Sequence, residues 1–307
     1  MVSAAILAAA GLIACAIIFF PGNFRTGAKG QRKELLQFWE SGLYEEVFNQ
    51  SKAALAARPM DYFLLTMQGF SAYQLGISQV NKPDAENYFN ECIWSLRKAL
   101  LMKNALNDGR LYYVLGKAYS YKGESYADLA VKYLENAKGL NYRAADIPEY
   151  LGMAYALLGD YRSSVEAFSE ALGTQGFTES RATGSASAGK GPSGPLFFSI
   201  AKSYFALEEF DTARTYLQRC IEVSSDFQTV LSARLLLAEI LKITGDYDRA
   251  VQLLTEILAE TGGNAEVHYQ IGELFALQGD TVRARAEWRL ALRTDPAHIK
   301  ARTRLAM

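Results

Sequence analysis

A small residue recurs in this chain at intervals close to 34 positions, and this period restricts the fold more than any other feature of the sequence. Each small residue follows a large apolar one and precedes an aromatic or apolar one by three positions: Leu115-Gly116 with Tyr119, Leu151-Gly152 with Tyr155, Ile200-Ala201 with Tyr204, Leu237-Ala238 with Leu241, and Ile271-Gly272 with Phe275. The small residues lie 36, 49, 37 and 34 positions apart. A period of about 20–50 residues is typical of folds that stack similar supersecondary units.

A second set of marks follows the first. It begins with glycine-containing turns at Gly159-Asp160-Tyr161, Gly245-Asp246-Tyr247 and Gly279-Asp280. An alanine then precedes a large apolar residue by four positions and another small or apolar residue by seven, as in Ala284, Trp288 and Ala291. Residues at these spacings share one face of a helix. The pattern predicts two paired helices per repeat, which the small residues allow to approach closely.

This combination of marks resembles the tetratricopeptide repeat, whose unit carries a Leu-Gly pair, an aromatic residue three positions on, and Ala, aromatic, Ala and Pro in its second half. The match is best from Ile271-Gly272 through Trp288 to Pro296, and weaker copies lie around Gly42 and Gly69. The resemblance implies an all-α, right-handed α-solenoid of about seven helix-turn-helix units. Four units are expected in residues 29–172, and three units with a C-terminal capping helix in residues 196–307.

The resemblance also implies where a partner binds. In this family the second, fifth, ninth and twelfth positions of each first helix line a concave groove that receives partner segments. Carried onto this sequence, the register gives ten candidates: Arg110, Tyr113, Lys117, Glu149, Met153, Phe198, Lys202, Phe205, Tyr269 and Glu273. We expect Tyr113, Phe198 and Phe205 to be aromatic anchors, and Arg110, Lys117 and Lys202 to meet acidic groups. The alternative is a solvated inner face without a ligand.

Residues 173–195 interrupt the repeats and are rich in Gly, Ser and Pro, a composition typical of a flexible loop. Within this segment, residues 184–190 match most of a phosphate-binding loop and end in Lys190. However, Gly191 stands where the Ser or Thr that binds Mg²⁺ is needed, and no strand is expected before the motif. The sequence therefore predicts a linker and no nucleotide binding.

The N-terminal segment is strongly apolar. Met1 to Phe20 contain no charged side chain, and about 20 such residues span the hydrocarbon core of a bilayer as one helix. We expect residues 1–21 to be an uncleaved transmembrane anchor, joined to the repeats by residues 22–28. A cleaved signal peptide is one alternative, although it lacks the usual basic start and small-residue cleavage site. Lipidation of Cys15 is another, because residues 12–15 resemble a lipobox.

Basic residues follow this segment and none precede it. Arg25, Lys29, Arg32 and Lys33 lie just beyond it, and such residues tend to remain in the cytoplasm. We therefore expect a single-pass protein of the bacterial inner membrane with its repeats in the cytoplasm; a periplasmic position is the alternative.

Composition excludes several function classes. The 32 basic and 33 acidic side chains leave a net charge of −1, which does not fit a nucleic-acid-binding surface. His268 and His298 lie in separate predicted helices, and Cys92 and Cys220 lie 128 positions apart, so we expect no metal site and no disulfide. No cofactor and no catalytic constellation are predicted.

Two function classes remain. The first is a non-catalytic, membrane-tethered scaffold that binds protein partners and organises a bacterial cell-envelope complex. The alternative is a ligand-binding lipoprotein or transporter accessory subunit lipidated at Cys15. Whether Cys15 is the mature N-terminus distinguishes the two.

Overall fold

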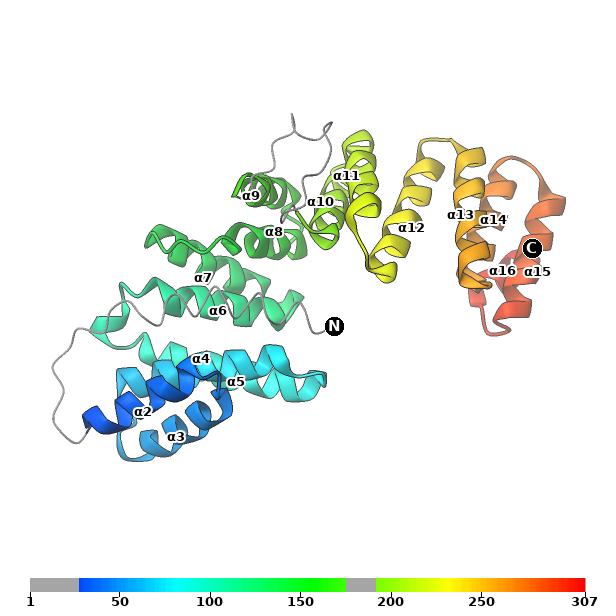
Figure 1. The fold of residues 1–307 in the computed structure, drawn as a ribbon. Helices are drawn as coiled ribbons and strands as arrows, with labels where there is room; N and C mark the ends of the chain where they lie inside the picture. The colour runs from blue at the N-terminus through cyan, green and yellow to red at the C-terminus, as the bar shows by residue number, and fades with distance from the viewer. Residues whose placement is uncertain (1–27, 175–191, 307) are drawn as a thin grey trace. The chain divides into compact units, whose positions relative to one another are not determined.

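The computed structural model describes residues 28–174 and 192–306, and within these ranges the chain is all helical, with fifteen α-helices and no strand (Figure 1). The chain divides into two compact units, residues 1–174 and 175–307. We call their described parts unit 1 (28–174) and unit 2 (192–306). Each unit is considered by itself.

Unit 1 consists of four helix pairs, and each helix contacts the next. The first helices also contact one another, α4 with α6 and α6 with α8, so they stack along one face of the unit. The pairs are α2 (Ala28–Glu40) with α3 (Tyr44–Ala57), α4 (Tyr62–Ser78) with α5 (Lys82–Ala99), α6 (Gly109–Tyr121) with α7 (Ala127–Gly139), and α8 (Ile147–Leu157) with α9 (Tyr161–Thr174).

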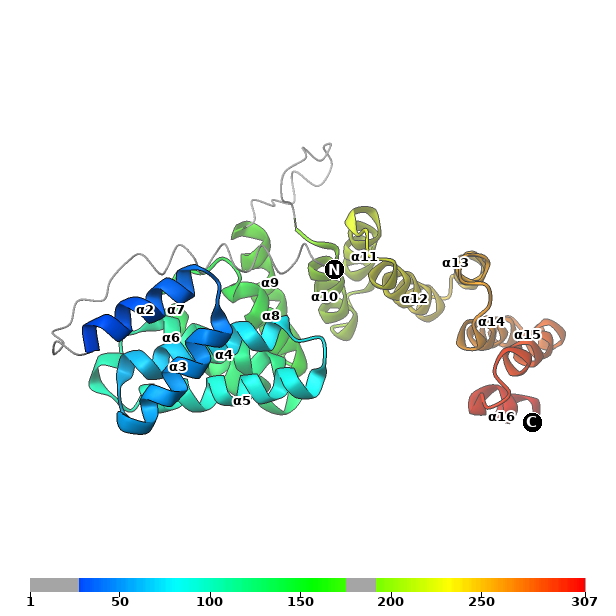
Figure 2. The same cartoon turned by 60° about the horizontal axis from the view of Figure 1, so that its bottom comes forward.

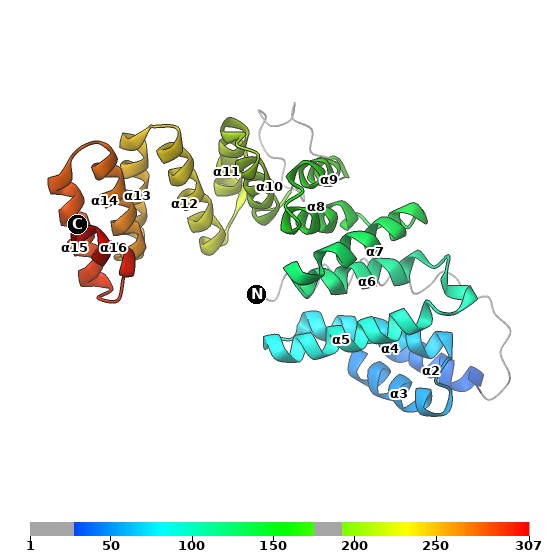
Figure 3. The ribbon, with the colours of Figure 1, turned by 180° about the vertical axis from the view of Figure 1, so that it is seen from behind.

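Unit 2 consists of three pairs and a final helix, in the order that Figure 3 shows from behind. The pairs are α10 (Gly194–Ala206) with α11 (Phe210–Val223), α12 (Phe227–Ile243) with α13 (Tyr247–Thr261), and α14 (Ala265–Leu277) with α15 (Thr281–Thr294). The final helix, α16 (Ile299–Ala306), packs against α15. The seven pairs of the described ranges agree with the number of repeats expected from the sequence.

The two helices of a pair cross where the small residue of the first helix faces the large apolar residue of the second. A Cβ atom on Gly116 would lie 2.5 Å from Cγ of Leu134, and one on Gly272 would lie 2.5 Å from the indole of Trp288. Only a residue without a side chain fits at these positions. The predicted close approach of the paired helices at the small residues is therefore confirmed.

The turns within the pairs depend on left-handed backbone. Gly159 (φ 76°), Gly245 (φ 82°) and Gly279 (φ 82°) occupy the predicted turns, where glycine is preferred because it has no Cβ. In the first pair of unit 2 this role falls to Glu208, with φ 62°, which the sequence pattern did not reveal.

The C-terminal helix covers the last repeat as predicted. Ala301 is fully buried in a cluster with Ala284, Trp288 and Ala291. The apolar side of α15 is therefore shielded from solvent, which is the role of a capping element in a repeat protein.

Three sequence predictions concern residues outside the described ranges: the anchor in residues 1–21, lipidation of Cys15, and the phosphate-loop-like motif in residues 184–190. The predicted loop, residues 173–195, was too wide at both ends, because α9 continues to Thr174 and α10 begins at Gly194 after the N-cap Ser193. In the ranges that the structure describes, no helix combines the length and the apolar character needed to cross a bilayer.

Candidate functional site

The first helices of unit 2 form a groove, which we call the α12/α14/α16 groove. It has a volume of about 590 Å³ and lies between α12, α14 and α16. Ala238, Leu254 and Leu274 form an apolar floor, and these three side chains are buried. The repeat pattern explains this groove. In each first helix the small residue packs against the paired second helix, so that the residue after it, Glu239 or Glu273, lies on another face of the helix and lines the groove.

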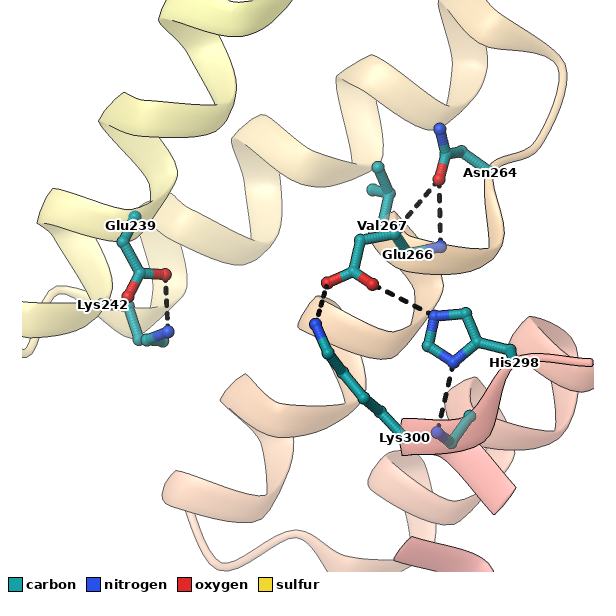
Figure 4. Close-up of polar contacts among 8 residues, drawn as sticks. Glu239, Lys242, Asn264, Glu266, Val267, His298 and Lys300 are labelled. Atoms are coloured by element: carbon teal, nitrogen blue, oxygen red, sulfur yellow. Dashed lines mark hydrogen bonds and ion pairs between the residues drawn. The ribbon is translucent and has the colours of Figure 1, made fainter. Parts of the chain in front are cut away.

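Three acid–base pairs line this groove, one within α12 and two between α16 and α14. Lys242 donates to Glu239 at 2.5 Å within α12, Lys300 of α16 donates to Glu266 of α14 at 3.3 Å, and Arg304 Nε donates to Glu273 at 2.8 Å. Figure 4 shows the first two pairs, with Lys300 reaching from the final helix to α14. The charges balance, so the groove favours no ligand by net charge alone.

His298 fixes the start of α16 beside the groove. Its Nδ1 accepts the backbone N–H of Ala301 at 3.2 Å, and its Nε2 lies 3.1 Å from Oε2 of Glu266 (Figure 4). Because Nδ1 is an acceptor, the ring proton belongs on Nε2, which donates to Glu266. His298 is thus a cap and a link between the last repeat and the final helix.

Tyr269 and Gln270 provide the neutral polar groups of the groove. Partial burial, with the nearby Glu273 carboxylate, raises the pKa of the Tyr269 phenol. Lys300 Nζ lies 5.6 Å from the centre of the Tyr269 ring. Gln270 also lines the groove, and its amide makes no hydrogen bond within the described ranges. An amide supplies both a donor and an acceptor, which suits contact with the backbone of a bound polypeptide.

The sequence prediction identified only part of this groove. Tyr269 and Glu273 line it as expected, whereas Glu239, Lys242, Lys300 and Arg304 were missed. Glu239 directly follows the small residue of its repeat, as Glu273 does, so the same register carried onto that repeat would have identified it. Lys300 and Arg304 belong to the capping helix, which has no place in the repeat register.

The three candidates of the first pair of unit 2 lie elsewhere. Phe198, Lys202 and Phe205 are on α10 and do not line the α12/α14/α16 groove. Lys202 is exposed with Nζ 5.3 Å from the centre of the Phe198 ring, and Phe205 packs against Phe210. Phe198 and Phe205 are half-buried, so part of each ring is exposed to solvent. Neither residue is part of the α12/α14/α16 groove.

Tyr113 and Lys117 in unit 1 correct the sequence prediction. Both side chains are only 6% exposed. Lys117 Nζ donates to Asp146 at 2.7 Å, and Tyr113 donates to the same carboxylate at 2.8 Å. Lys117 also lies 4.6 Å from the ring centre of Tyr150. The prediction that Tyr113 is an aromatic anchor not required for repeat packing is therefore wrong: it is part of a buried internal network.

The remaining candidates of unit 1 have local partners or no clear ligand. Asp108 accepts two hydrogen bonds from the Arg110 guanidinium, at 2.8 and 2.6 Å, and these raise the pKa of Arg110. Burial, and to a smaller extent the negative charge of Asp146, raises the pKa of the Glu149 carboxyl. Met153 is half-buried on α8. Arg110 therefore pairs with Asp108 at the start of its own helix. The sequence register instead predicts that it meets an acidic group of a partner.

Other reactive residues do not gather. Cys92 and Cys220 are buried, and neither forms a disulfide. In the described ranges no group of three or more His, Cys, Asp or Glu residues is arranged to hold a metal ion. The described lining of the α12/α14/α16 groove contains no Ser, Cys or His.

The helix pairs, the small residues at their crossings and the capping helix define a class of protein, the α-helical repeat proteins. Residues 195–307 match the family model described as a tetratricopeptide repeat-like domain. This match confirms the resemblance to the tetratricopeptide repeat that was inferred from the sequence.

Solved structures show the same fold over a larger part of the chain. The C-terminal part of a TPR repeat-containing protein from Cytophaga hutchinsonii is 14% identical with a TM-score of 0.61, over 90% of this chain and 100% of that one. YrrB, described as a TPR protein with an unusual peptide-binding site, is 21% identical with a TM-score of 0.51, over 69% of this chain and 98% of that one. Comparison with curated proteins gave no match.

Proposed function

We propose that this protein is a non-catalytic interaction scaffold whose α12/α14/α16 groove receives an extended segment of a partner protein. The observation that carries the proposal is the groove itself: an apolar floor with neutral polar groups and balanced acid–base pairs on its walls. Such a mixture suits a polypeptide, which presents apolar side chains and backbone amides together. The peptide-binding site described for YrrB, a protein with this fold, supports the proposal.

The proposal is tested by filling the groove. Gln270→Trp places a large side chain in the groove without removing an acid–base pair, and we expect at least a tenfold loss of partner recovered from detergent-solubilised membranes. Gln252→Trp is the matched control, because Gln252 is exposed on the second helix α13. Quantitative mass spectrometry of the recovered proteins measures the effect. Equal recovery with both variants contradicts the groove assignment.

We also propose that residues 1–21 anchor the scaffold in the bacterial inner membrane, where it organises a cell-envelope complex. The support is the uncharged stretch from Met1 to Phe20 and the basic residues that follow it, which favour a cytoplasmic position of the repeats. The intact mass of the membrane form should retain Met1, and external protease should digest the repeats only after the membrane is opened. A mature start at Cys15 favours the lipoprotein alternative.

A further inference from the structure

A second groove lies in unit 1, on the side formed by second helices, and we call it the α3/α5 groove. Lys52 and Leu55 of α3 form one wall, and Glu91, Trp94 and Lys98 of α5 form the other. Its volume is about 850 Å³. Figure 2 shows α3 and α5 at the lower edge of unit 1. The surface is distinct from the α12/α14/α16 groove, which is built of first helices in unit 2.

The floor of the α3/α5 groove holds a buried amide with an unused acceptor. Gln68 of α4 is only 2% exposed and faces the groove. Its Nε2 donates to Oε2 of Glu91 at 3.4 Å, but its Oε1 is buried and accepts no hydrogen bond from any described residue. Buried polar atoms are nearly always paired in folded proteins. A donor on a bound molecule would satisfy this oxygen once the side-chain amide turns toward the groove, which Gln68 lines.

The wall contributed by α5 exposes a large aromatic ring. Trp94 is 55% exposed, although it lies on a well-packed helix. Lys98 Nζ lies 4.7 Å from the centre of its ring, and no described carboxylate is within ion-pair distance of Lys98. Tryptophan is one of the residue types enriched among the interface residues that dominate affinity. Pro59 extends the apolar surface beside it.

The charges of the groove indicate the chemistry of its occupant. Lys52 and Glu91 neutralise one another at 2.7 Å. Lys98 is then the unmatched charge of the walls, and it sits next to the exposed indole. A ligand that matches this groove would carry an acidic group for Lys98, an apolar group for Trp94 and an N–H group for Gln68.

We propose that the α3/α5 groove binds an extended, acidic segment of a partner protein, with an apolar side chain of the segment against Trp94, a carboxylate at Lys98 and a backbone N–H donated to Gln68. A polypeptide fits better than a small metabolite because the groove is open along two helices and its polar groups are spread along its length. The chain therefore has two independent binding surfaces, one in each unit.

The test uses the full chain and three sets of fluorescein-labelled twelve-residue peptides. The first set alternates Glu with Leu or Phe, the second replaces every Glu by Lys, and the third replaces every apolar residue by Ser. Fluorescence anisotropy measures binding. Acrylamide quenching, compared between the wild type and Trp94→Ala, measures whether the peptide covers Trp94.

We expect the first set to bind the wild type and protect Trp94, and the other two sets to bind at least tenfold more weakly. Lys98→Glu should weaken the first set at least tenfold. Lys132→Glu is the matched control, because Lys132 is exposed on α7 and has no ion-pair partner in the described ranges; its binding should stay within twofold of the wild type. Far-UV circular dichroism confirms that both variants remain helical.

Several results would overturn the proposal. These are equal binding by Lys98→Glu and Lys132→Glu, binding of the Lys-containing set as tight as that of the first, or no protection of Trp94 by any set. A concentration-dependent dimer that Trp94→Ala dissociates in sedimentation would show that a second copy of the chain occupies the groove. Retention on anionic vesicles that Lys98→Glu abolishes, without peptide binding, would identify a lipid surface instead.

Discussion

Replacing Gly272 by alanine should destabilise unit 2, although alanine is the better helix former. The methyl group would lie 2.5 Å from both Cδ1 and Nε1 of Trp288 and 3.1 Å from the backbone oxygen of Ala284. Overpacking of this kind costs about 1–3 kcal/mol, whereas Ala is favoured over Gly in a helix interior by about 1 kcal/mol. The net loss in the free energy of unfolding is therefore about 1 kcal/mol and at most about 2 kcal/mol.

Urea unfolding of the full chain, followed by circular dichroism, measures this loss, and hydrogen exchange of α14 and α15 assigns it to unit 2. Gly173→Ala is the control, because no heavy atom lies within 4 Å of the added methyl group; it should stabilise α9 by up to about 1 kcal/mol. In a Trp288→Ala background, Gly272→Ala should cost less, because the contact with the indole is gone and only the 3.1 Å contact with the backbone oxygen of Ala284 remains. If Gly272→Ala stabilises unit 2 by about 1 kcal/mol, as helix propensity alone would do, the close crossing of α14 and α15 is wrong.

Three further predictions concern single side chains. Glu208→Gly should stabilise unit 2 by about 1 kcal/mol in urea unfolding, because Glu208 has a φ of 62° that costs a residue with a Cβ roughly this much. Asp146→Asn should destabilise unit 1 by about 1–3 kcal/mol by leaving Lys117 buried and unpaired, whereas Lys117→Met should stay within about 1 kcal/mol of the wild type; equal losses would contradict this. The stability of unit 1 should decrease with acid: burial opposes ionisation of Asp108, but the Arg110 hydrogen bonds hold the pKa of Asp108 below its usual value. The folded state then binds the proton less readily than the unfolded chain, so the stabilisation is complete at neutral pH and is lost as the pH falls below about 4. The urea midpoint of Asp108→Asn should depend less on pH in that range.

The repeat architecture could be predicted because it depends on few residue types at a fixed spacing. Gly116 and Gly272 must be small for the helices to cross, and Gly245 must adopt a left-handed turn. These requirements are visible in the sequence without knowledge of the partner elements. The helix pairs, the turns that contain glycine and the capping helix could therefore be predicted from the sequence, whereas the turn at Glu208 could not.

The candidate site was predicted less well, because a register position does not determine what a side chain meets. Tyr113 and Lys117 occupy positions that the repeat register assigns to the groove. Both instead donate hydrogen bonds to Asp146, which lies 33 residues after Tyr113 and 29 residues after Lys117. Lys300 and Arg304 lie in a helix outside the repeat, and Trp94 lies on a second helix where the register expects packing. Whether such a side chain is buried or lines a groove depends on contacts with neighbouring helices. The pattern of residues within one repeat does not contain this information.

Hydrogen exchange of the full chain, with and without its copurified partner, tests the central proposal most directly. The proposal predicts that amides of α14 and α16 exchange at least tenfold more slowly with the partner bound, and that Gln270→Trp removes this protection while Gln252→Trp retains it. Protection confined to the second helices α11 and α13, or unchanged by Gln270→Trp, would contradict binding in the α12/α14/α16 groove.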